Sequence, residues 1–216
     1  MKNFYRKVAF GLGPKDKVPS DPLEWATSQL NEIPEFSWKG KILPEKELRN
    51  YYRDYVYGDR KVLRKKFKND KDGYKREKNK LRHETGQKFW WNLELCIRHS
   101  EALKSETPVL AKLWYFWGNH FAISDKDFLP KYTTGAYQRE IIRANMNQNF
   151  EKMVQEATVA WTMIHHLDNN DNVGPKSQEA QWAKEKGRKV GVNENHAREL
   201  LELHTVSPKC GYTQED

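Results

Sequence analysis

The sequence predicts an all-α fold, a multi-helix domain, from three observations. No run of β-branched residues resembles a buried strand, and apolar side chains instead recur at three- and four-residue spacing. The 8 Trp, 9 Phe and 10 Tyr offset a hydrophobic content of 37%, because each buried aromatic ring removes a large area from water. A chain of 216 residues is long enough for one such domain.

The first expected elements are short. Two glycines and a proline in the segment 9–14 predict a turn. Asp21-Pro22-Leu23-Glu24 then supplies a capping residue, a proline for the first helical position and the acid of a capping box. We therefore expect a helix from there to about Leu30, followed by a proline-bounded loop over residues 34–44.

A long helical region is expected from Glu45 to about Ser105. We expect breaks at Gly58, Gly73 and Gly86, since glycine is costly inside a helix. Helical spacing in the last part of the region predicts one buried face. That face comprises Phe89, Trp90, Leu93, Cys96 and Ile97.

The next helices are predicted on either side of residue 130. Thr107 and Pro108 mark the start of the first one. Its apolar stripe comprises Leu110, Leu113, Trp114, Trp117 and Phe121. Gly135 is expected to precede the second helix, which runs through Ile142.

The last part of the chain predicts two helices separated by irregular segments. Residues 150–166 form the first, and residues 167–172 form a polar turn. The segment 173–192 is expected to be an exposed charged loop. Asn193 then caps a final helix that ends near Thr205.

The net charge of +8 belongs to one element. Residues 59–82 contain 12 Lys or Arg and 4 Asp or Glu, so this basic helical segment accounts for the whole excess. The basic residues 61–82 include Phe67 and Tyr74, and such a mixture can bind nucleic acid. A solvated helix face is the favoured interpretation, and we expect no specific binding of nucleic acid.

The sequence also bears on the compartment of the protein and on the completeness of the domain. Cys96 and Cys210 lie far apart and show no metal-ligand spacing. No apolar stretch approaches the roughly 20 residues of a membrane span, and no signal peptide is visible, so this sequence alone indicates a cytoplasmic protein. Thr213 followed by two acids resembles the start of a further helix, so we expect the domain to be truncated at its C-terminus.

Polar and ionisable side chains concentrate on the final helix and in two earlier segments. The candidate catalytic residues are His120, Asp168, Glu199 and His204, and the candidate ligand-binding residues are Asn119, Asn169, Asn193, Glu194, Arg198 and Glu202. On an ideal α-helix, positions 194, 198 and 202 lie about 40° apart on one face. That face either forms a charged ladder in water or binds a ligand in a cleft.

Each candidate also has a structural interpretation. His120 suits general acid–base chemistry, but a lone histidine near a helix end also suits a core or capping role. Asp168 and Asn169 fit turn chemistry, because Asp and Asn side chains bond their own backbone. If a site exists, His120, Asp168 and Arg198 should converge beside a cavity.

We predict no metal site, and the sequence indicates no particular cofactor. Glu202 and His204 are close in sequence, yet residues two apart differ by about 200° around an α-helix. Their side chains therefore cannot chelate one ion unless the helix ends before His204.

Four segments occur together in a characteristic order. They are Phe10-Gly11-Leu12-Gly13-Pro14, Trp117 to Ser124, Leu167-Asp168-Asn169, and Asn193 to Thr205 followed by Gly211-Tyr212-Thr213-Gln214. The combination resembles the bacterial domain-of-unknown-function family numbered 1800 over most of the chain. The resemblance implies that the chain is the N-terminal half of a larger helical protein, because members are typically about double this length.

The resemblance also implies export for many members and a sulfatase-like or phosphatase-like partner. It implies no established activity. Three hypotheses therefore stand: an enzyme or ligand-binding domain that uses the His/Asp/Glu/Arg cluster, a non-catalytic helical scaffold, and a nucleic-acid binder that uses residues 61–82.

Overall fold

The computed structural model describes residues 2–13, 16–124 and 130–216, and every regular element within them is helical. The α-helices are α1 (Lys2–Val8), α2 (Pro22–Ser28), α3 (Glu45–Asp54), α4 (Arg60–Lys66), α5 (Lys71–Glu84), α6 (Gln87–Lys104), α7 (Pro108–His120), α8 (Pro130–Tyr137), α9 (Phe150–Val159), α10 (Trp161–His166), α11 (Gln178–Glu185) and α12 (Asn195–Glu199). Three π-helical turns continue α3, α8 and α12, namely η1 (Tyr55–Asp59), η2 (Gln138–Arg143) and η4 (Leu200–His204), and two 3-10 turns are η3 (Asn169–Asp171) and η5 (Pro208–Cys210). The all-α prediction is confirmed.

The main hydrophobic core lies between α7, η2, α9 and α10. Its largest buried members are Leu110, Trp114, Phe121, Tyr137, Ile142, Met153 and Met163. The predicted apolar stripe on α7 is confirmed, with Leu113 and Trp117 packed partly buried against the same cluster. This core fixes the end of α7 relative to α9 and α10.

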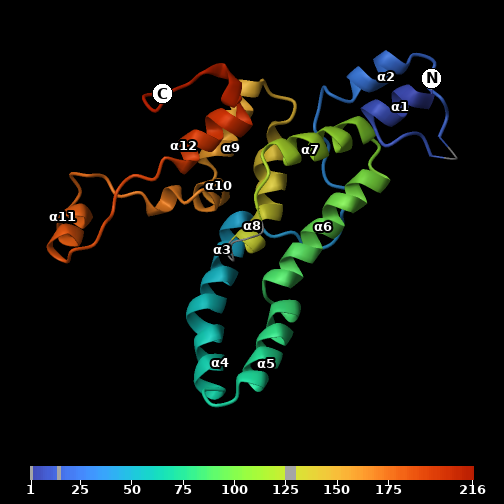
Figure 1. Cartoon of the computed structure of the whole chain (residues 1–216). Helices are drawn as coiled ribbons and strands as arrows, with labels where there is room; N and C mark the ends of the chain where they lie inside the picture. The colour runs from blue at the N-terminus through green and yellow to red at the C-terminus, as the bar shows by residue number, and fades with distance from the viewer. Residues whose placement is uncertain (1, 14–15, 125–129) are drawn as a thin grey trace.

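A long arm projects from this core (Figure 1). The helices α4 and α5 form its outer end and pack side by side (Figure 1). The basic segment 59–82 lies mostly on these two helices. The expected breaks were partly wrong. Gly58 lies inside η1 and Gly73 lies in the first turn of α5, where its amide donates to the capping Asp70 at 2.8 Å. The break at Gly86, between α5 and α6, is confirmed.

The buried face of α6 differs from the predicted one. Trp90 and Ile97 are buried as expected, but Phe89 is 40% exposed and Cys96 is exposed. Two glutamates, Glu94 and Glu101, occupy the buried face instead. Buried carboxylates require partners, and a hydrophobic pattern cannot reveal those partners in advance.

Glu94 joins α6 to the second half of the chain. Arg139 in η2 donates to its carboxylate through Nε and Nη2, both at 2.8 Å, and to the carbonyl of Leu43 at 2.7 Å. Gly135 lies inside α8, not before it as expected, because α8 begins at Pro130. A Cβ atom at Gly135 would overlap the side chain of Glu94, so glycine permits the close approach of α6 and α8.

Two arginines of the π-helical turn η2 are buried together. Arg139 and Arg143 are both buried, and Arg143 donates to the carbonyl of Pro34 at 2.6 Å. The indole of Trp114 donates to the carbonyl of Gln138 at 2.8 Å, which joins α7 to the same turn.

The C-terminal region is more broken than the sequence predicted. The expected helix over residues 150–166 is divided at Ala160, which has an extended backbone, into α9 and α10. The segment 173–192, expected to be a loop, contains α11. The N-cap of α12 is Glu194, not Asn193 as expected. Asn193 lies one residue earlier, where its side chain accepts a hydrogen bond from the amide of Asn195 at 3.0 Å.

The expected turn near the N-terminus is present up to Gly13, with Gly11 at a positive φ of 99°. Pro14, the last residue of that turn, lies outside the described residues. None of the helices in the described ranges has the length and apolar character needed to cross a lipid bilayer.

Candidate functional site

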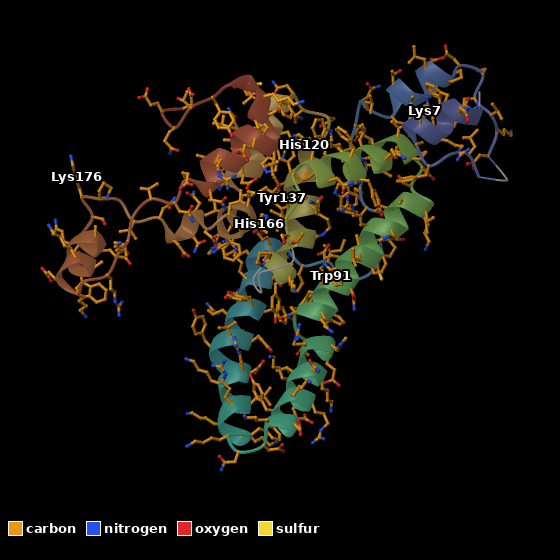
Figure 2. All side chains as sticks on the ribbon, in the orientation of Figure 1. Lys7, Trp91, His120, Tyr137, His166 and Lys176 are labelled. Carbon is orange, nitrogen blue, oxygen red and sulfur yellow. The ribbon has the colours of Figure 1, made fainter. Side chains whose placement is uncertain are left out.

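A cleft of about 680 Å³ lies where three segments meet: the end of α7, the end of α10 and the final helix. Its lining comprises Asn119, His120, Ala122, Ser124, His166, Leu167, Asp168, Asn195, Glu199, Leu203 and His204. Figure 2 labels His120 and His166, the last residues of α7 and α10. The cleft therefore joins residues from distant parts of the sequence.

Two histidines join α7 to the final helix by reciprocal hydrogen bonds. His120 Nε2 donates to the carbonyl of His204, and His204 Nδ1 donates to the carbonyl of His120, both at 2.9 Å. The last carbonyls of a helix lack intrahelical partners. Each histidine thus caps the helix that carries the other, which is the capping role considered for His120.

These bonds also determine where the protons lie on both rings. A carbonyl only accepts, so His120 carries a proton on Nε2 and His204 carries one on Nδ1. Burial lowers the pKa of His204 below its ordinary value, despite an opposing effect of its hydrogen bond with His120. His204 is therefore neutral at pH 7, with Nε2 as an unprotonated acceptor.

The π-helical turn η4 explains why His204 and Glu199 line the same cleft. In an α-helix, residues five apart differ by about 140°, so the two side chains would lie on different faces. A π turn bonds residues five apart, so it aligns His204 with Glu199. Such turns occur frequently at functional sites.

Arg198 lies beside the cleft and does not line it. Its guanidinium donates to Glu202 at 2.9 Å, to Asn195 at 2.6 Å and to Glu199 at 3.4 Å. Glu202 also accepts from the hydroxyl of Tyr212 at 2.7 Å. Arg198 thus orients Asn195 and Glu199, two residues that do line the cleft.

Three asparagines join the residues before and after the segment 173–192. The side chain of Asn172 donates to Asn169, and its oxygen accepts from the amide of Asn193. The amide of Val173 donates to the carbonyl of Gly191 at 2.9 Å. Together these bonds hold the two ends of the segment 173–192 against each other.

The predicted site residues therefore separate into two groups. Those that line the cleft are Asn119, His120, Asp168, Glu199 and His204, and those outside it are Asn169, Asn193, Glu194, Arg198 and Glu202. His120 and Asp168 share the cleft as the convergence hypothesis requires, whereas Arg198 contributes only through its neighbours.

Sequence reasoning missed several lining residues. His166 accepts a hydrogen bond from the amide of Ser124 at 3.3 Å, and both residues line the cleft. Asn195 was missed although it lies one helical turn before Glu199. The available signal was proximity, since His166 lies two residues before Asp168.

Hydrogen-bond acceptors prevail in the cleft. Asp168 and Glu199 contribute carboxylates, and His204 contributes its Nε2. Asp168 has a left-handed backbone, with φ 57° and ψ 19°, which Asp tolerates better than most residues. Among the residues that the structure describes, no three His, Cys, Asp or Glu side chains gather closely enough to hold a metal ion.

Comparison with known proteins identifies one family. The family described as "Protein of unknown function (DUF1800)" matches residues 3–216. No curated protein and no solved structure shows a significant match to the chain.

Proposed function

Because the chain belongs to DUF1800, a family of unknown function, we propose a function from the cleft alone: it binds a small molecule rich in hydroxyl or ammonium groups. We further propose that His204 accepts a proton from that molecule as a general base. The observation that supports this proposal most is the reciprocal bonding of His120 and His204, which fixes the orientation of both rings in a shared cleft.

The electrostatic environment supports a ligand that donates hydrogen bonds. Asp168 and Glu199 are acidic, and two helix C-termini, each the negative end of a helix dipole, meet at the histidines. The apolar side chains of Leu167 and Leu203 form part of the same surface. A neutral polyol or a compact amine matches this combination better than an anion does.

The proposed roles differ between residues. His204 is the candidate base, since burial keeps it unprotonated and its Nδ1 proton is engaged with His120. His120, Asn119, Asp168 and Glu199 position the ligand. Asn169, Asn193, Glu194, Arg198 and Glu202 shape the cleft from outside it.

Two substitutions separate ligand binding from helix capping. In His204→Asn the amide nitrogen takes the place of Nδ1, so the bond to the His120 carbonyl persists while the Nε2 acceptor is lost. In His120→Gln the amide nitrogen takes the place of Nε2, and the rest of the ring is lost from the cleft. His99→Gln is the matched control, because His99 is exposed on α6 and lies outside the cleft.

Isothermal titration with myo-inositol, glucose and putrescine tests binding. We expect at least one probe to bind the unchanged protein, and each cleft variant to weaken that binding by about tenfold, the effect of about 1.4 kcal/mol. His99→Gln should leave the affinity unchanged. Absence of binding by all three probes, or equal binding by folded His204→Asn protein, would leave only the scaffold interpretation, in which the histidines serve as caps.

A further inference from the structure

A second pocket, of about 200 Å³, lies at the junction of α5, α6 and α8. Its lining comprises Arg82, His83, Gln87, Lys88, Trp91, Asn92 and Lys131. Figure 2 shows Trp91 on α6, apart from His120 and His166 of the first cleft. No residue lines both pockets.

Positive charge dominates the second pocket. Arg82, Lys88 and Lys131 contribute cationic side chains, and no carboxylate occurs among the described residues of its lining. Within the described part of the chain, neither Arg82 nor Lys88 forms an ion pair. The composition is opposite to that of the His120–His204 cleft, which is acidic.

Uncharged partners hold these two cations in place. Gln87 is only 1% exposed, and in the amide orientation that satisfies both groups its oxygen accepts from Arg82 Nη2 at 2.8 Å and Nε at 3.1 Å. Lys88 Nζ donates to His83 Nε2 at 3.2 Å, because an ammonium group cannot accept. Neutral partners orient the cations without cancelling their charge.

The N-terminus of α6 adds to the positive potential of the pocket. Its first turn contains no acidic residue, and its N-cap residue is Gly86, which has no side chain to accept hydrogen bonds from the first amides. A lysine in the first turn is unfavourable beside the positive end of the helix dipole. Lys88 occupies that turn, so an anion in the pocket would relieve the repulsion.

We propose that this pocket binds a small tetrahedral oxyanion, phosphate or sulfate, either free or as the ester of a small organic group. Arg82 and Lys88 would donate to its oxygens, since charge-assisted hydrogen bonds are the stronger ones. The indole of Trp91, 40% exposed, provides an apolar surface for the organic group. The volume of about 200 Å³ fits one such group.

Titration calorimetry at low ionic strength tests the proposal with three probes: inorganic phosphate, inorganic sulfate and phenyl phosphate. Arg82→Gln and Lys88→Gln should each weaken binding by about tenfold. Arg76→Gln removes the same charge from an exposed position on α5 outside the pocket, and should change affinity by less than about twofold. Comparison of phosphate with sulfate identifies the preferred anion.

Trp91→Ala provides a second, independent readout. It should weaken binding of phenyl phosphate while leaving binding of inorganic phosphate unchanged, because only the ester reaches the indole. The proposal fails if the unchanged protein binds none of the three probes. It also fails if Arg76→Gln weakens binding as much as Arg82→Gln, since diffuse attraction would then explain the result. Either outcome leaves the proposal for the His120–His204 cleft unaffected.

Discussion

Replacement of Glu94 by leucine should destabilise the protein more than most single substitutions. Glu94 and Arg139 have side chains only 8% and 5% exposed, and two hydrogen bonds of 2.8 Å join them. Glu94→Leu leaves the guanidinium buried, with the carbonyl of Leu43 and the more distant Glu140, at 3.6 Å, as its remaining partners. Removing one partner of a buried ion pair costs about 3–5 kcal/mol.

The remaining partners place the expected loss at about 3 kcal/mol, the lower end of that range. Unfolding entropy of about 2.1 cal/mol/K per residue gives about 0.45 kcal/mol/K for this chain, so Tm should fall by about 7 °C. The double variant Glu94→Leu/Arg139→Met removes both charges and leaves the Leu43 carbonyl without its donor. It should lose only about 1–2 kcal/mol.

Thermal and urea unfolding of the two single variants and the double variant measure the coupling between the residues. Glu156→Leu, which removes the exposed pair of Lys152 and Glu156, is the control and should cost less than about 1 kcal/mol. The reasoning is refuted if Glu94→Leu is as mild as this control, or if the double variant loses as much as the sum of the single ones.

Two further perturbations test the packing and the cleft. Gly135→Ala should destabilise the protein by about 1–3 kcal/mol through overpacking, because the new Cβ overlaps Glu94. Thermal unfolding should show this as a Tm lower by several degrees, and an unchanged Tm would show that α6 and α8 separate easily. Burial lowers the pKa of His204, so the unfolded chain binds more protons, and the free energy of unfolding should fall as the pH drops below about 6.5. His204→Asn should reduce this dependence of the unfolding free energy on pH, measured by urea titration at several pH values. Part of the dependence should remain, because burial also lowers the pKa values of His165 and His196. An unaltered dependence would contradict a lowered pKa for His204.

Local signals in the sequence were sufficient for several elements. Asp21 caps α2 as expected, accepting from the amides of Leu23 at 2.8 Å and Glu24 at 3.0 Å. The stripe on α7 was predictable because its spacing reports directly which side chains share a face. These features depend only on residues within one or two helical turns.

Features that depend on distant partners were not predictable. The burial of Glu94 requires Arg139, and the glycine inside α8 is explained only by the approach of α6. The π turn at residues 200–204 has no local signature, yet it determines which face carries His204. For the same reason, residue type identified His120 and Asp168 as candidates, while spacing alone could not separate the lining residues from Arg198 beside them.

The reciprocal bonds between His120 and His204 close a loop of 84 residues in the chain. Closing such a loop costs conformational entropy, and the cleft is complete only when the final helix is docked on α7. A ligand that occupies the cleft binds this docked state alone, and it must stabilise docking by mass action. Occupancy would therefore be detectable far from the site, as slower amide hydrogen exchange in the final helix.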